Sequence, residues 1–446
     1  MSSFNFFGET IPKTHAEFGQ YLRRAHEEKH HPLCLCKSPG IPMYVSRASN
    51  TYILKRMPNR GALHHSDCDS YAVPAHLSGR GLMEDKAITE NHDTGLTSLK
   101  LAFPLTKSAG SRDPITPSSG EQKTVQAETT KLTIRALLEY LYEEAGLTRW
   151  SPRMKGKRNW HVVRHNLVQA AQNKMSHKNA IAQRLLVPEF FSVEKKGEIA
   201  ARRRHFFASM APTKGKLQFS ILIGEVKAIE TARFGGKLII KHMPDMPIYM
   251  AADVFKRVGK VFASQIAMFE QDEDIHLLTI MTFYLSASGN PQVETISFMT
   301  VDSNWLPFDN ICEKELMERL VTDNRYFLRS MRYNLSSTDV MATAILTDTK
   351  PDATAFYIVP LGATEAYYDE LDQLVNSTDT PSHIWDTNDE VAMTLPPHTN
   401  PTVDRPSKGQ TEIPPRDDLP PNDDFPPVDM YADEPYPEYE EEPFSD

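Results

Sequence analysis

The 446-residue chain is poor in cysteine and has no long apolar run. Only four cysteines are present, and three of them, Cys34, Cys36 and Cys68, fall within 35 positions of one another. No window approaches the roughly 18 uninterrupted apolar residues of a membrane span, and the first 20 residues lack the basic and apolar segments of a secretory signal. The sequence therefore predicts a cytoplasmic protein without membrane contact, in which clustered cysteines favour metal binding over disulfides.

Motifs of the common enzyme classes are missing too. The chain has no Gly-rich phosphate loop, dinucleotide fingerprint, nucleophile elbow or His-Glu-x-x-His sequence. The best catalytic candidates are Glu225 and Lys227 on one strand face, which is half of the metal-binding arrangement of restriction-type nucleases, although alternating charge on a half-exposed strand explains them well. Asp348 is a second candidate, but the strand after it offers no acid and no lysine. A metal-dependent or degenerate nuclease is an alternative function, and no catalytic residue is assigned.

Two short-spaced pairs of potential metal ligands are present. Cys34 and Cys36 form the first pair, His64 and Cys68 form the second, and 27 residues separate them. Structural zinc takes four sulfur or nitrogen ligands in a tetrahedron, usually supplied as two such pairs. We therefore predict one structural zinc ion that these four side chains enclose.

The choice of histidine is open at this point. His65 is adjacent to His64, and His30 and His31 precede the first cysteine pair, so spacing alone does not exclude them. The competing interpretation is three free thiols near surface histidines. A disulfide between Cys34 and Cys36 is disfavoured, because it would be strained and in a reducing compartment.

Positive charge is concentrated in the middle of the chain. Residues 149–216 hold 16 Lys and Arg against three Glu, a net charge of +13. Cations attract phosphates and exposed aromatic rings stack on unpaired bases, so the segment predicts nucleic-acid binding, with DNA favoured. The predicted contact residues are Arg153, Lys155, Lys157, Arg158, Trp160, Arg164, Arg202, Arg203 and Arg204. The competing interpretation is that Lys and Arg stems cover helix surfaces while the tryptophans lie in the core.

Negative charge is concentrated at the other end. Residues 395–446 hold 14 acidic and three basic side chains and 13 of the 32 prolines, a composition that predicts disorder. This tail offers a partner for the basic segment, or a docking peptide for another protein. An interaction scaffold acting through the tail is thus a second alternative function.

Hydrophobic patterning predicts a mixed α+β chain. Helical spacing is found over residues 132–141, 162–170 and 254–269, and β-type runs at 219–229 and 237–241 indicate a hairpin that turns at Gly235. The predicted parts are a zinc-bound β-rich module (1–106), a linker (107–129), a basic helical region (130–216), a mixed α/β domain (217–380) and a disordered acidic, Pro-rich tail (381–446).

The sequence also resembles a family encoded on conjugative plasmids and integrative elements of proteobacteria, catalogued as domain of unknown function eleven seventy-three. The resemblance covers most of residues 30–375. It rests on Leu33-Cys-Leu-Cys36, Pro42-Met-Tyr-Val45, Arg56-Met-Pro58, Gly61-Ala-Leu-His64 with Cys68, Gly95-Leu-Thr-Ser-Leu-Lys-Leu-Ala-Phe103, Trp150-x-Pro152, Gly156-Lys-Arg158 with Trp160, Val187-Pro-Glu-Phe190, Trp305-Leu-Pro307 and Arg332-Tyr-Asn334. It implies a mobile-element setting and the Cys, Cys, His, Cys set as a family feature, and it favours His64 over His65. It implies no activity.

Overall fold

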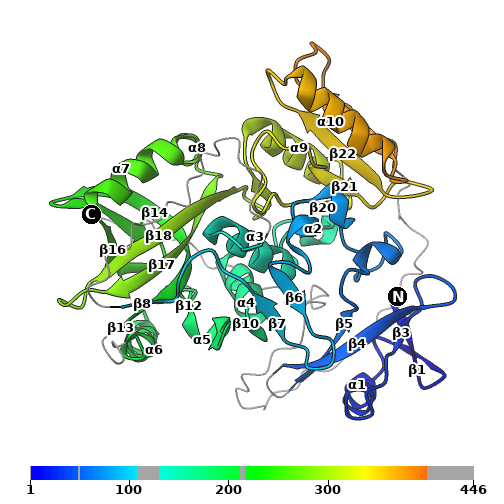
Figure 1. Ribbon diagram of the computed structural model, residues 1–446, viewed down its shortest axis with the longest axis horizontal. Helices are drawn as coiled ribbons and strands as arrows, with labels where there is room; N and C mark the ends of the chain where they lie inside the picture. The colour runs from blue at the N-terminus through cyan, green and yellow to red at the C-terminus, as the bar shows by residue number, and fades with distance from the viewer. Residues whose placement is uncertain (1, 49–50, 109–129, 211–215, 399–446) are drawn as a thin grey trace.

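Helices and strands are interspersed along the chain, and the fold is mixed α+β, as predicted. The computed structural model describes residues 2–48, 51–108, 130–210 and 216–398. Figure 1 shows the chain beginning in a sheet at one side of the molecule, crossing the centre as helices, forming a large sheet at the opposite side and returning to a further sheet above the N-terminal part. Among the described helices, none has the length and apolar character needed to cross a membrane.

The N-terminal sheet is fully antiparallel, with the order β2-β1-β3-β4-β5. Alternating side chains of its strands, among them Phe4, Phe6 and Met43, are buried in one cluster with Leu22 and Ala25 of helix α1. The elements are β1 Ser3–Phe6, β2 Glu9–Pro12, α1 Phe18–Glu27, β3 Leu33–Cys34, β4 Ile41–Ala48 and β5 Thr51–Arg56. The predicted β-rich N-terminal part is confirmed.

Two smaller sheets join the N-terminal part to the middle of the chain. Four strands pair in the order β11-β10-β7-β6, and β8 pairs with β13 across the predicted linker, of which residues 109–129 lie outside the described residues. The strands are β6 Ile88–Glu90, β7 Thr97–Leu99, β8 Thr106–Ser108, β10 Lys174–Ser176, β11 Asn179–Ala180 and β13 Lys216–Gln218.

The largest sheet has seven strands, and five of them pair as a closed ring, β14-β15-β16-β18-β17 and back to β14. Gly235 makes the predicted hairpin turn. Its φ is +129°, and a Cβ there would lie 2.2 Å from the carbonyl oxygen of Met250. The strands are β12 Leu185–Leu186, β14 Ser220–Ala232, β15 Gly235–Ile240, β16 Met243–Met250, β17 His276–Leu285, β18 Pro291–Val301 and β19 Pro307–Phe308.

Two helices cover this sheet where the patterning predicts a single helix over 254–269. Helix α7 (Ala252–Val261) ends just before Phe262, and α8 (Ala263–Gln271) begins just after it. The Phe262 ring packs edge-on against Phe298 of β18, with ring centroids 5.0 Å apart. Apolar periodicity continues through Phe262, so the sequence pattern does not reveal the break.

The C-terminal sheet has the order β23-β22-β21-β20-β9. Its strands are β9 Arg149–Trp150, β20 Phe327–Arg329, β21 Ala344–Leu346, β22 Thr354–Val359 and β23 Ser382–Asp386, and the longer helices of this part are α9 Ile311–Thr322 and α10 Glu365–Asn376. Strand β23 falls inside the predicted tail and pairs in parallel with β22, so the tail boundary at residue 381 is corrected. Residues 399–446 of the predicted tail lie outside the described residues.

The hydrophobic cores cross the predicted boundaries. One cluster combines Phe6 and Met43 of the N-terminal sheet with Ile345 and Tyr357 of the C-terminal sheet. Another combines helices α3 (Ile134–Glu144) and α4 (Trp160–Ala170) with β14 and β17. The N-terminal part and the helical region are therefore not independent modules. The remaining elements are η1 Gly61–Leu63, η2 Ala75–Leu77, α2 Arg80–Met83, η3 Pro152–Met154, α5 Ile181–Arg184 and α6 Lys196–Ala208.

A buried ion pair in the C-terminal part gives a stability prediction. Arg325 donates from Nε and Nη2 to the two carboxylate oxygens of Asp348, at 2.8 Å each, and both side chains are almost fully buried. Asp348→Asn leaves the guanidinium without a countercharge, so we expect the free energy of unfolding in urea to fall by about 3–5 kcal/mol. The variant Arg325→Met/Asp348→Leu removes both charges and should be clearly more stable than the single variant. Equal destabilisation of the two variants would contradict this account.

Candidate functional site

Two sulfur donors come from strand β3 and the turn after it. Cys34 ends β3 and is paired on one side with Phe4 and on the other with Ile41. Cys36 follows in the turn toward β4, which Gly40 completes with a φ of +117°. Because Cys34 is fixed by two neighbouring strands, the turn has little freedom in placing Cys36.

The nitrogen donor and the third sulfur come from the segment after β5. His64 directly follows η1, and the Cys68 N–H donates to the His65 carbonyl at 2.8 Å in the next turn. Gly61 allows close packing here, since a Cβ on it would lie 2.5 Å from that of Ala72. The predicted second pair is therefore presented by two successive tight turns.

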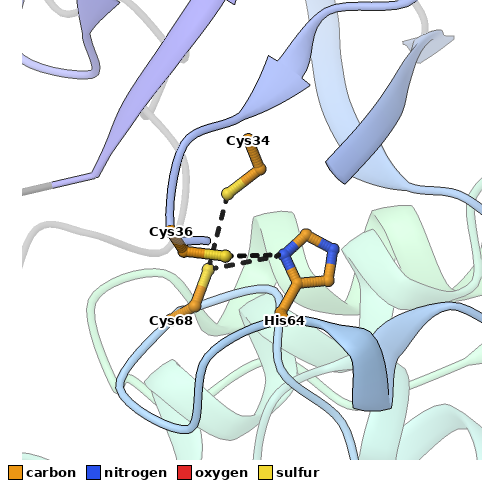
Figure 2. A group of neighbouring side chains, drawn as sticks. All are labelled: Cys34, Cys36, His64 and Cys68. Atoms are coloured by element: carbon orange, nitrogen blue, oxygen red, sulfur yellow. Dashed lines mark hydrogen bonds between the residues drawn. The ribbon is translucent and has the colours of Figure 1, made fainter. Parts of the chain in front are cut away.

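The four predicted ligands meet at one point, as Figure 2 shows, and their donor atoms all lie within 4.8 Å of one another. The Sγ atoms of Cys34 and Cys68 are 3.7 Å apart, and His64 Nδ1 is 3.4 Å from Cys36 Sγ and 3.7 Å from Cys68 Sγ. Within the described ranges, no other group of three or more Cys, His, Asp or Glu residues brings its donor atoms so close. This cluster can hold a metal ion.

The thiols of Cys34 and Cys68 are hydrogen-bonded to each other. This bond is the main cause that lowers the pKa of Cys68, and His64 and the Ser70 N–H, 3.4 Å from Cys68 Sγ, act in the same direction. The same hydrogen bond, together with burial, raises the pKa of Cys34. Cysteine binds metals as the thiolate, so a metal ion held here would replace thiol protons.

The surroundings favour further negative charge on the sulfurs. The His65 N–H donates to Cys36 Sγ at 3.5 Å. The guanidinium of Arg149 donates to the Tyr71 carbonyl, and its positive charge interacts with Cys68. If a divalent ion bound three thiolates here, the cluster would carry a net charge of −1, which the charge of this arginine would offset.

The orientation of His64 fits ligation through Nδ1. Its Nε2 is buried and, among the described residues, has no hydrogen-bond partner, so all of its polar contacts are to sulfur at Nδ1. The three alternative histidines, His65, His30 and His31, contact other groups. His65 Nδ1 accepts from the Asp67 N–H at 3.2 Å, His30 accepts from the Phe7 N–H at 3.2 Å, and His31 contacts the Met43 carbonyl at 3.2 Å.

A comparison with protein-family models finds one that covers most of this architecture. The family described as protein of unknown function, DUF1173, matches residues 4–388. The chain belongs to the DUF1173 family. No match was found among curated proteins or among solved structures. The matched range of this DUF1173 protein includes the whole Cys, Cys, His, Cys cluster and all five sheets, so the cluster and the fold that presents it belong to one family unit.

Two of the predicted nucleic-acid contacts are buried, and the prediction that they touch nucleic acid is wrong. Trp160 is 2% exposed and donates from Nε1 to the Pro188 carbonyl at 2.8 Å. Arg158 is 7% exposed and donates to main-chain carbonyls, including that of Leu147 at 2.8 Å. A buried guanidinium needs such acceptors, and here they come from the chain itself.

The other predicted contacts include three arginines with partners inside the fold and four cations with exposed side chains. Arg164 is half-buried and donates to the Val187 carbonyl at 3.1 Å. Arg202 binds both oxygens of Glu189, at 2.8 and 2.7 Å, and Arg203 forms an ion pair with Asp245. The exposed side chains are Arg153, Lys155, Lys157 and Arg204. About half of the predicted interface is therefore occupied by contacts within the fold.

Glu225 has partners that sequence reasoning missed. It is 3% exposed on β14, and its Oε1 accepts from His276 Nδ1 at 2.8 Å and from Lys241 Nζ at 3.2 Å, while His242 Nε2 lies 3.3 Å from Oε2. Burial alone would raise the pKa of Glu225, but the nearby His242 imidazole, the hydrogen bond from His276 and the charge of Lys241 lower it to about 2. Glu225 is paired with Leu278, two residues after His276 on β17, so only this register could have revealed His276 as a partner.

The structure does not assemble the predicted nuclease pairs. Glu225 lies on β14 of the seven-stranded sheet, whereas Asp348 follows β21 of the C-terminal sheet and is bound by Arg325. Lys227 is exposed farther along β14. Glu225 is thus surrounded by imidazoles and an ammonium group, and no second carboxylate from the predicted pairs reaches it.

Glu225 makes stability depend on pH. Its folded-state pKa of about 2 lies below the ordinary value of 4.5, so the stabilisation is fully present above pH ~4.5 and is lost as the pH falls toward 2. We expect Glu225→Gln to lower the free energy of unfolding by roughly 3 kcal/mol at pH 6 and by less at pH 3, measured in urea at each pH. Glu230→Gln, on the same strand, is the control and should change stability little. A gap between wild type and Glu225→Gln that does not change with pH would contradict this account.

Proposed function

We propose that this protein is a zinc-containing, nucleic-acid-binding accessory or regulatory protein of a conjugative plasmid or integrative element, acting in the cytoplasm. The donor set supports zinc. The convergence of basic residues on one segment of the chain supports nucleic acid. The resemblance to a family of mobile elements supports the setting.

Three sulfurs and one imidazole nitrogen are the ligand types that zinc takes at closed structural sites. All four positions of a tetrahedron are filled by protein groups, which leaves none for a substrate and argues for a structural role. Binding of this kind is worth on the order of 10–16 kcal/mol in small zinc domains, much of it appearing as folding free energy. Because Cys34 belongs to β3, that energy stabilises the N-terminal sheet directly.

Removal of one ligand tests the zinc site. Purified protein should contain one zinc ion per chain by elemental analysis, and Cys68→Ala should lose it and unfold at a lower temperature, since three ligands no longer close the tetrahedron. Cys312→Ala is the matched control, because this half-buried thiol on α9 lies outside the cluster. Wild-type protein without zinc, or a Cys68→Ala variant that retains it, would contradict the proposal.

One observation carries the nucleic-acid proposal. Side chains from two separate basic elements hold the same short segment, residues 187–190. From α4, Trp160 binds the Pro188 carbonyl and Arg164 binds the Val187 carbonyl, and from α6, Arg202 binds Glu189. The segment ends in Phe190, whose ring is 48% exposed.

The two elements that hold this segment also carry exposed cations. Arg153, Lys155 and Lys157 lie in the exposed stretch before α4, and Arg204 lies on α6. Exposed cations together with an exposed aromatic ring are typical of proteins that bind single strands. The site therefore favours single-stranded nucleic acid over base-pair recognition.

The salt dependence of binding tests this surface. Lys155→Gln/Lys157→Gln should weaken binding to a single-stranded oligonucleotide and reduce the slope of log K against log salt by about 1.4, since each phosphate contact on a single strand contributes about 0.7. Lys256→Gln/Lys260→Gln on α7 removes the same charge elsewhere and should leave the slope unchanged. Binding should be measured with DNA and with RNA by fluorescence anisotropy at several salt concentrations. Equal slopes for the two double variants would contradict the proposed surface.

The alternative functions have less support. The restriction-type nuclease lacks its pair of carboxylates, as described above. The scaffold depends on the acidic tail, and residues 399–446 lie outside the described residues. Both remain distinguishable from the main proposal, because neither predicts the salt slope of the Lys155 and Lys157 variant.

A further inference from the structure

The imidazole of His276 is held at one nitrogen and open at the other. Nδ1 contacts the buried carboxylate of Glu225 at 2.8 Å, so in the neutral ring the proton lies on Nδ1 and the lone pair on Nε2. In the part of the chain that the structure describes, Nε2 has no hydrogen-bond partner, and the side chain is 23% exposed. This is the orientation of a histidine that accepts a proton from a bound molecule.

A tryptophan fixes the plane of this ring. The Trp305 ring stacks on His276 with centroids 4.5 Å apart and planes 11° from parallel. The backbone of Trp305 has a φ of +60°, an unfavourable conformation for a bulky residue, and such strain is found mainly where a site requires it. Asp302 maintains the loop by accepting from the N–H groups of Asn304 and Leu306 at 2.9 and 2.8 Å.

Further groups complete the cluster. Lys241 contacts the same carboxylate oxygen as His276, and its side chain is 45% exposed, so its ammonium can reach a bound anion. His242 Nε2 lies 3.3 Å from the other carboxylate oxygen. The buried His242 ring stacks on the Trp160 ring, with centroids 5.2 Å apart. Phe190 also contacts the His242 ring at 5.2 Å, which connects the cluster to the segment proposed above to bind single strands.

From this geometry we infer that Glu225, His276 and Lys241 form a metal-independent site that cleaves bound RNA at its phosphodiester bonds. His276 is the general base, Lys241 stabilises the negative charge on phosphorus, and Glu225 is a positioning residue that fixes the His276 tautomer. This assignment rests on the proposed function, because it requires a single strand held beside Phe190.

The chemical step is an internal transfer. His276 Nε2 removes the proton of an RNA 2′-hydroxyl, and the oxygen forms a bond to the adjacent phosphorus. The bond from phosphorus to the 5′ oxygen of the next nucleotide breaks. That oxygen takes a proton from water, and the hydroxide formed removes the proton from the His276 imidazolium. The products are a 2′,3′-cyclic phosphate and a free 5′-hydroxyl.

The cluster selects RNA and needs no metal for the step above. DNA lacks the 2′-hydroxyl that serves as the internal nucleophile, so it binds without being cut. The Lys241 ammonium, which contacts the Glu225 carboxylate at 3.2 Å, opposes the binding of a cation there.

The experiment uses full-length, zinc-containing protein, a 5′-labelled single-stranded RNA and buffer without added Mg²⁺ or Mn²⁺, with binding and cleavage measured on the same samples from pH 5 to 8. We expect products that end in 2′,3′-cyclic phosphate, and no cleavage where the nucleotide is 2′-deoxy. His276→Ala should cut at least 100-fold more slowly while binding RNA as well as wild type does. His177→Ala removes an exposed histidine elsewhere and should keep full activity.

A second variant separates positioning from folding. Glu225→Gln should retain the fold by circular dichroism but lose activity at least 10-fold and shift the pH profile, since the amide no longer holds the proton on Nδ1. Wild-type protein that binds RNA and leaves it intact, or equal cleavage by wild type and His276→Ala, would overturn the proposed site and leave the binding function standing. Absence of binding to any single strand would overturn both.

Discussion

The architecture depends on carboxylates buried in one central helix. Glu144 of α3 accepts from Lys174 at 2.7 Å and from Arg80 at 3.0 Å, and Glu139 accepts from the Tyr333 N–H. Burial alone would raise the pKa of Glu144, but the charges of Lys174 and Arg80 hold it well below its usual range. The partners come from the N-terminal part, the helical region and the C-terminal part. A buried charge without its partner is costly, so these three parts have to assemble together.

This constraint explains which features of the fold could be predicted from the sequence. Local signals were sufficient for the hairpin at Gly235, because turn residues and β-branched runs determine it. The division into modules was wrong, because pairs such as Arg80 with Glu144 join residues 64 positions apart across a predicted boundary, and Phe6 shares a core with Tyr357. Composition along the chain contains no information on contacts of this kind.

The same distinction applies to the sites. The cluster of candidate metal ligands could be predicted because each pair lies within one turn, and the two turns needed only to face each other. The partners of Glu225 could not, because His242 follows a hairpin and His276 begins the strand paired on the opposite side of β14. The net charge of a segment was also a poor guide to which of its charged residues are exposed. Arg158 counts toward the +13 of residues 149–216, yet its guanidinium is hydrogen-bonded inside the protein.

Arg149 connects the metal cluster to the basic surface. It begins β9, its guanidinium binds the Tyr71 carbonyl three residues after Cys68, and its charge interacts with that sulfur. The next residues along the chain are Trp150, buried against the C-terminal sheet, and then the loop that carries Lys155 and Lys157. The residue from which this loop starts is therefore held by the segment that carries Cys68. If the proposed zinc ion is bound, it stabilises that segment, and the zinc proposal and the nucleic-acid proposal then concern adjoining parts of the chain.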